Sequence, residues 1–390
     1  ITGFVLLSGG AAKSDSDLLT TCALLLIALA GPGIFNAGYV SCLSVIGDNA
    51  TLKGVLSASM AAVFDGSALV FFLLQLAEIS FGGLSVPALV WSLVCACLGG
   101  SFWYYLRPGS SASTTRSLDA VDEKQAETES HEQSGVSVDD QSLLAKDSQL
   151  VATLLSTTNL LMAAFMACYC LIQNFYIESQ LDEFALRYGS ETAEQIAAVF
   201  NIAFPVGGFL TAFPASLLMR RFGGEPHIYW GLVFSLSLLF GVLSLVPSPS
   251  TQILASLIFG PIRCLQYTCY FQFLGDERRY SSDITGRAIG YNMVAIGCIG
   301  DAGPPVLTYL VTMDSWGGDK GGRYFAIKLG LLLALAACVA LPVKLWRELS
   351  AHRLRGSAVA RELHEVTETQ PISPRGSDDS EMKFVGGGAL

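Results

Sequence analysis

The stretch GPIRCLQYTCYFQFLGDERRY, residues 260–280, places an arginine in the middle of an otherwise apolar segment. Arg263 lies twelve residues after the start of the apolar run 251–274 and eleven residues before its end. As a helix this run would cross a bilayer, with Arg263 roughly 16–18 Å from either interface. An arginine side chain reaches only about 6–7 Å, too short to bring its charge to the headgroups. The charge must therefore face water, an anion or a carboxylate inside the protein.

The composition of the whole chain indicates the same class. Of 390 residues, 52% are hydrophobic and only 14% are charged, whereas a soluble domain carries about 25% charged residues. Apolar runs of about 20 residues or more can cross a hydrocarbon core of roughly 30 Å. We therefore predict an all-α polytopic membrane protein. The nine expected spans are 19–46, 54–76, 82–106, 150–177, 192–219, 226–247, 251–274, 284–313 and 324–346.

Two segments lack apolar runs. Residues 107–149 are Ser-rich, acidic and poor in aromatics, which predicts a disordered linker, and the tail 348–390 has the same character. The acids behind the net charge of −10 are mostly outside the spans, and no basic patch indicates nucleic-acid binding. The chain begins with Ile1, and the residues ITGFVLLSGG (1–10) have the character of the end of another span. We therefore expect further helices upstream.

Cysteines and histidines do not form a metal or haem site in the sequence. The ten cysteines are almost all inside apolar spans, where small packing residues are expected, and Cys95 and Cys97 have no second pair to complete a metal site. The histidines are all in loops or tails: His131, His227, His352 and His364. We expect no metal and no cofactor.

Basic residues are distributed unevenly between alternate loops. If 107–149 is cytosolic, the loops on its side hold most of the Lys and Arg, including Lys53, Arg278 and Arg279. The opposite side holds few, and its loop at 175–195 is acidic. The positive-inside rule therefore predicts a cytosolic linker and a cytosolic C-terminus.

Two parts of the chain follow one pattern. AGPGIFNAGYVSCLSVIGDNATLKG (30–54) and FGPIRCLQYTCYFQFLGDERRYSSDITGRAIG (259–290) share a Gly-Pro and a Gly-Asp at matching places. Eleven residues beyond the last glycine of each lies an aspartate within an apolar span, Asp65 and Asp301. This indicates parallel repeats, a building plan of secondary transporters. Arg263 has Ile34 as its counterpart, and such asymmetry is expected of a site for an asymmetric ligand.

These motifs resemble the major facilitator superfamily. GPGIFNAGYVSCLS…KGVLSASMAAVFDGSALVFFLLQ and GRAIGYNMVAIG are similar to the branch of sodium-independent large-neutral-amino-acid facilitators and their fungal and protist relatives. The resemblance covers the membrane part of the chain and implies a major facilitator fold of two six-helix repeats, here lacking about the first three helices. It implies that 1–106 holds the end of helix 3 and helices 4–6, and that 150–347 holds helices 7–12.

The resemblance also places a cytosolic loop motif at GGFLTAFPASLLMRRFGG (207–224). Arg220, Arg221 and Gly223 match that motif, but the usual aspartate is replaced by an apolar residue at Leu218-Met219. The motif is therefore only partly kept.

The resemblance makes 251–274 helix 10, one of the helices that line the central cavity. Gln266, Tyr267 and Tyr270 follow Arg263 at helical spacing and form one polar face with it. We interpret Arg263 as the ligand of a substrate carboxylate, because a guanidinium donates two parallel hydrogen bonds, which lysine cannot do. The alternative is a permanent pair with Asp301 or Asp65 that only holds helices together.

The other polar residues of the spans have two interpretations each. Asp65 and Asp301 could exchange protons during transport, or they could be hydrogen-bonded at a glycine-lined seam where the two halves meet. Asn159 and Asn36 could bond a substrate in the cavity, or they could form packing bonds between helices.

We expect a secondary transporter of a small organic solute, foremost an amino acid, working by alternating access as a monomer in a lipid bilayer. The membrane is the plasma membrane or a vacuolar or other endomembrane. A Walker loop is absent from the sequence, which argues against an ATP-driven pump. Asp65 and Asp301 lack the local motifs of an aspartyl protease, so no enzyme is predicted. The alternatives are a non-transporting nutrient sensor, with the linker and tail as regulatory segments, and a transporter of another small organic anion.

Overall fold

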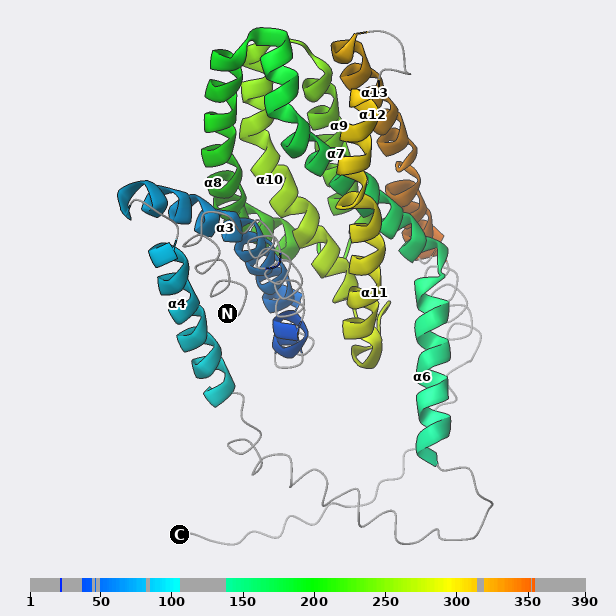
Figure 1. Ribbon diagram of the computed structural model, residues 1–390. Coiled ribbons are helices and arrows are strands. Elements are labelled where there is room, and N and C mark those ends of the chain that lie inside the picture. The colour runs from blue at the N-terminus through cyan, green and yellow to red at the C-terminus, as the bar shows by residue number, and fades with distance from the viewer. Residues whose placement is uncertain are drawn as a thin grey trace, which may run out of the picture. The chain divides into compact units, whose positions relative to one another are not determined.

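The computed structural model describes residues 22, 37–43, 46, 50–81, 85–105, 138–313, 319–351, 353 and 354. All regular structure in these residues is helical (Figure 1). The chain divides into two compact units, 1–345 and 346–390, and in the second unit residues 346–351 are helical. The helices described below belong to the first unit, apart from residues 346–351 at the end of the last one.

Five helices of the described residues are long and apolar enough to cross a membrane: Thr157–Tyr188, Ser190–Phe222, Pro226–Leu245, Asp283–Thr312 and Lys320–Ala351. They correspond to five of the predicted spans, so the protein is a multi-pass integral membrane protein. Helix α10 (Pro249–Leu274) is not one of these five; its apolar residues are interrupted by Arg263 and Gln266. The predicted span 19–46 lies mostly outside the described residues.

Helix α10 occupies the interior of the first unit (Figure 1). It packs against α8 (Ser190–Phe222), α9 (Pro226–Leu245) and α3 (Ala50–Phe81), and α3 in turn packs against α4 (Ser85–Tyr105). Every residue of α10 from Gln266 to Leu274 is buried. Neighbouring helices rather than lipid therefore surround this half of α10.

Small residues allow α8 and α10 to approach closely. A Cβ atom at Gly260 would come within 2.8 Å of the backbone nitrogen of Gly208, and one at Gly207 would come within 2.7 Å of Pro261 Cδ. Pro205, Pro214 and Pro261 all lie inside the two helices. The helices pack across a glycine-lined face, as is typical of helices in membranes.

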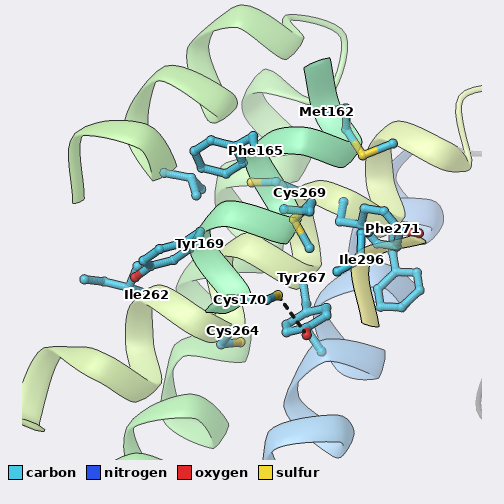
Figure 2. Packing of buried hydrophobic residues seen from close by; sticks show 14 of the residues in the cluster. Met162, Phe165, Tyr169, Cys170, Ile262, Cys264, Tyr267, Cys269, Phe271 and Ile296 are labelled. Atoms are coloured by element: carbon cyan, nitrogen blue, oxygen red, sulfur yellow. Dashed lines mark hydrogen bonds between the residues drawn. The ribbon is translucent and has the colours of Figure 1, made fainter. Parts of the chain in front are cut away.

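The core around this contact is aromatic. The Phe259 ring of α10 meets the rings of Phe240 in α9 and Phe200 in α8 edge-on, with centroids 5.4 Å and 5.0 Å apart. Trp230 packs in the same way on Phe165 of α7 (Thr157–Tyr188), at 5.3 Å. Such pairs each contribute about 0.5–1.5 kcal/mol beyond the burial of their area. Figure 2 shows the part of this core in which α7 side chains meet those of α10.

Helix α7 is longer than the predicted span 150–177. It begins at Thr157, where Ser156 Oγ accepts a hydrogen bond from the backbone N–H of Asn159 at 3.2 Å, and it continues to Tyr188. Its last turns belong to the stretch 175–195 that was predicted as an acidic loop. The prediction ended the helix at the first acidic residue, whereas burial of that face by neighbouring helices extends it.

A further helix, α6 (Val138–Leu154), precedes α7 and covers 138–149 of the predicted disordered linker. It packs against α11 (Ser282–Gly300) through two ion pairs. These pairs are Lys146–Asp283 at 3.1 Å and Asp147–Arg287 at 2.8 Å. The linker therefore ends in a helix, and its residues 107–137 lie outside the described residues, as does most of the tail 348–390.

The span Asp283–Thr312, predicted as 284–313, consists of two consecutive helices, α11 and α12 (Gly303–Thr312), with a break of two residues at Asp301–Ala302. Pro304 and Pro305 have no amide hydrogen, so they cannot donate to the carbonyls four residues earlier, those of Gly300 and Asp301. The last predicted span, 324–346, begins as α13 (Lys320–Ala337) and is helical again from residue 340.

Candidate functional site

Arg263 lies in the middle of α10 and is partly exposed. Its Nη1 donates hydrogen bonds to Gln173 Oε1 at 3.4 Å and to Asn174 Oδ1 at 3.3 Å, both on α7. Its guanidinium carbon lies 5.7 Å from the centre of the Phe204 ring and 5.5 Å from that of Tyr267. Two aromatic rings and two amide oxygens therefore orient the charge, and cation–π contacts of this kind are stronger away from water.

Asn174 connects Arg263 to the break between α11 and α12. Its Nδ2 donates to Asp301 Oδ1 at 2.7 Å and to the Gly300 carbonyl at 3.0 Å. Asp301 itself is exposed. The arginine and the aspartate are thus linked through one amide, whereas the predicted alternative was a permanent pair of Arg263 with Asp301 or Asp65.

Glycines allow the broken helix to approach α7. A Cβ atom at Gly300 would lie 2.7 Å from Cys170 Cβ, and one at Gly303 would lie 2.5 Å from Leu171 Cδ1. One interpretation of Asp301 placed it at a glycine-lined seam where the two halves of the fold meet, and it stays a prediction. In the described residues the close contacts of Gly300 and Gly303 are with α7, within 150–347.

The other predicted residues of the polar face are buried against α7. Gln266 and Tyr270 are fully buried, and Tyr267 is 7% exposed. Gln266 Nε2 donates to Met166 Sδ at 3.4 Å and to Cys170 Sγ at 3.6 Å, and the Tyr267 hydroxyl lies 3.5 Å from the same Cys170 sulfur (Figure 2). Of the four predicted residues of this face, Arg263 is therefore the one that is partly exposed.

Asn159 takes part in a different network. Its Oδ1 accepts hydrogen bonds from the Tyr280 hydroxyl at 2.7 Å and from Asn292 Nδ2 at 3.0 Å, and its Nδ2 donates to the Leu154 carbonyl at 2.9 Å. Burial raises the pKa of Tyr280, so its hydroxyl remains a donor at neutral pH. These contacts are the interhelical packing bonds that formed one of the two interpretations of Asn159.

Two predicted residues cannot be placed in the site. Asn36 lies outside the described residues, and Asp65 lies within α3, where only its backbone is described. The structure therefore brings Arg263, Gln266 and Tyr267 together against α7 and, through Asn174, links Arg263 to Asp301. Asn174 was not predicted, although an amide side chain within the apolar run 150–177 was an available signal.

The predicted loop motif forms the end of α8. Gly223 caps the helix, its N–H donating to the Met219 carbonyl at 2.7 Å, and the Arg221 guanidinium lies 5.4 Å from the centre of the Phe222 ring. Next to Gly223, Lys53 Nζ of α3 pairs with Glu277 Oε1 at 2.6 Å. A hollow of about 500 Å³ opens here, lined by Lys53, Gly223, Gly224, Gln272, Gly275, Asp276, Glu277 and Arg278.

A second cluster of charges, which was not predicted, lies near the C-terminal end of α7. Lys328 of α13 forms an ion pair with Glu183, and Arg187 Nη2 lies 3.2 Å from Glu183 Oε1. The Lys328 and Glu183 side chains are only 5% and 3% exposed. Lys328 Nζ also lies 5.4 Å from the centre of the Tyr176 ring. The i,i+4 spacing of Glu183 and Arg187 was the available signal that this stretch is helical.

Within the described part of the chain, no group of three or more His, Cys, Asp or Glu side chains is placed to hold a metal ion. No protein-family model matches the sequence, and no curated protein matches it either. The candidate site consists of an oriented, partly exposed guanidinium and an exposed carboxylate inside a multi-pass helical membrane protein.

Proposed function

We propose that the protein is a secondary transporter of the major facilitator fold that moves a small organic solute, foremost an amino acid, by alternating access. Arg263 carries this proposal. Its guanidinium lies deep between membrane-spanning helices, is oriented by the Phe204 and Tyr267 rings and by two amide oxygens, and keeps part of its surface open. Ionisable groups at such depth are costly and mark substrate or ion pathways.

The arrangement of helices supports the fold part of the proposal. Helix α10 contacts both α3 from the first part of the chain and α8 and α9 from the second. This is the place expected of a cavity-lining helix between two six-helix repeats. In this proposal the linker and C-terminus are cytosolic, and the protein works as a monomer in the plasma membrane or an endomembrane.

Uptake measurements test the function. The full-length protein is reconstituted into liposomes, and uptake of a panel of labelled amino acids is compared between the wild type, Arg263→Ala and Arg263→Lys. We expect both variants to lose at least about tenfold in uptake, because lysine cannot make the two parallel hydrogen bonds to a carboxylate. Arg287→Lys, at an exposed ion pair near the start of α11, is the matched control and is expected to transport normally.

The outcomes separate the alternatives. Normal uptake by Arg263→Lys would refute the carboxylate clamp. Saturable binding of amino acids without flux would identify a sensor on a transporter fold. Uptake of other carboxylates with no amino acid in the panel transported would identify a different organic-anion transporter. Uptake driven by a pH gradient and abolished in Asp65→Asn would show proton coupling.

A further inference from the structure

The side-chain amide of Asn174 bridges the positively charged Arg263 and the negatively charged Asp301. Its oxygen accepts from Arg263 Nη1 at 3.3 Å, and its nitrogen donates to Asp301 Oδ1 at 2.7 Å. The amide measures about 2.3 Å from oxygen to nitrogen, so the two charged atoms are at most about 8 Å apart. The site therefore presents a cation and an anion that a single small molecule can reach together.

The backbone beside Asp301 adds further acceptors. Because residue 304 is a proline, the Gly300 carbonyl lacks its helical donor, and it accepts from Asn174 Nδ2 at 3.0 Å instead. Pro305 deprives the Asp301 carbonyl of its helical donor in the same way. In several transporters the unwound backbone carbonyls of a discontinuous helix coordinate a cation, Na⁺, near the middle of the membrane. The break thus offers acceptors suited to an ammonium group.

The Asn174 amide matches an amino acid in its hydrogen bonding. Toward Arg263 it offers an oxygen acceptor, as a carboxylate would, and toward Asp301 it offers N–H donors, as an ammonium would. A zwitterion bound at both ends, with hydrogen bonds of about 2.8 Å at each, spans at most about 8 Å, the same upper limit as for the two charged atoms here. Asn174 occupies both positions at once and must give them up when such a ligand binds.

We propose that Asp301 binds the ammonium group of the substrate while Arg263 binds its carboxylate, with Asn174 displaced from between them. The substrate class is then a zwitterion with a free α-amino group, and simple carboxylates are poor ligands. This inference rests on the proposed transport function and on the exposure of Asp301, which leaves its carboxylate accessible.

Competition against uptake tests the inference. The probe is the amino acid taken up fastest in the panel, beginning with leucine, glutamine and arginine. Its competitors are the same compound without the amino group, without the carboxylate, and with the amino group acetylated. We expect all three to inhibit the wild type at least about tenfold more weakly than the free amino acid.

The variant Asp301→Asn should then lose the preference for the free amino group. We expect the ratio between the amino acid and its des-amino analogue to fall to within about threefold, while the discrimination against the compound without a carboxylate is kept. Asp301→Glu should restore part of the ratio. Asp283→Asn, an exposed aspartate at the start of α11, is the matched control and should leave the ratio unchanged.

Failure of the inference can be distinguished from failure of the proposed function. An unchanged ratio in Asp301→Asn, or equal inhibition of the wild type by the acetylated and free compounds, would overturn the role of Asp301 while transport stands. The acetylated compound needs no variant, so it decides the matter even if Asp301→Asn does not fold. If no amino acid is transported by the wild type, the proposed function itself fails.

Discussion

Two groups of charges lie along α7, and they are built in opposite ways. At one end Glu183 and Lys328 contact each other directly, and both side chains are almost fully buried. Near the middle, Arg263 and Asp301 are bridged by the amide of Asn174, and both are at least partly exposed. A direct buried pair satisfies both its charges and fixes two helices, whereas a bridged pair leaves surface for a ligand. We interpret the first as structural and the second as functional.

The largest effect should come from breaking the buried pair. Glu183→Gln leaves Lys328 without its carboxylate in a dry environment, so we expect the free energy of unfolding to fall by about 3–5 kcal/mol. Lys328→Met should cost less, because Glu183 keeps its ion pair with Arg187. The double variant Glu183→Gln/Lys328→Met should recover most of the loss, because no unpaired Lys328 charge is left buried and Arg187 still donates to the Gly321 carbonyl. Denaturant titration in mixed micelles measures all three. Losses that simply add in the double variant would contradict the pairing.

A second test concerns the packing that holds α10 beside the open site. Gly260→Ala would push a methyl group into the backbone of α8, so we expect a loss of about 1–3 kcal/mol. Gly231→Ala, in the middle of α9 with no atom within 4 Å of the new Cβ, is the control. It should be neutral or stabilising by about 0.5–1 kcal/mol, as is usual for glycine in a helix. The same unfolding titration applies, and equal effects at both positions would argue against the close α8–α10 contact.

The bridged pair of Arg263 and Asp301 should contribute less to stability than the buried pair of Glu183 and Lys328. Asp301→Asn keeps an oxygen that accepts from Asn174 Nδ2 and removes a charge that is exposed, so we expect it to change the free energy of unfolding by less than about 1 kcal/mol. A loss as large as that of Glu183→Gln would remove the distinction between the two clusters. The unfolding titration is done on the same preparation that is used for uptake.

The smallest effect is expected at the exposed ion pairs between α6 and α11. The side chains of Arg287 and Asp147 are 46% and 59% exposed, so Asp147→Asn should cost less than about 0.5 kcal/mol. The cost should shrink further at high salt, which screens exposed charges. Measuring the variant at low and high salt gives a reference for how little an exposed pair contributes. A salt-independent loss above 1 kcal/mol would mean that α6 is anchored by buried contacts.

Several features could be predicted because they depend only on the chain's own pattern. The long apolar runs predict membrane-spanning helices, since length and hydropathy are local properties. The depth of Arg263 follows from its place within such a run, and the break near Asp301 follows from the two prolines after it. The repeat and the family resemblance stay predictions, because the described residues do not test a two-repeat arrangement.

Contacts between distant parts of the chain could not be predicted. Periodicity shows which face of a helix is polar, but it does not show which helix lies against that face. For this reason Asn159 could not be assigned, and the structure places it with Asn292 and Tyr280. The Glu183–Lys328 pair was missed because the acidic residues at the end of α7 suggested a loop. That end of α7 is buried because α13 packs against it.

The sequence by itself determined the class of the protein, the position of most helices and the presence of an arginine that lipid cannot accommodate. The tertiary structure decided what that arginine faces. Glycines at 300 and 303 let the broken helix approach α7, and this approach places Asn174 between Arg263 and Asp301. A charge in the membrane needs a partner, but which partner it has depends on how closely the helices can pack.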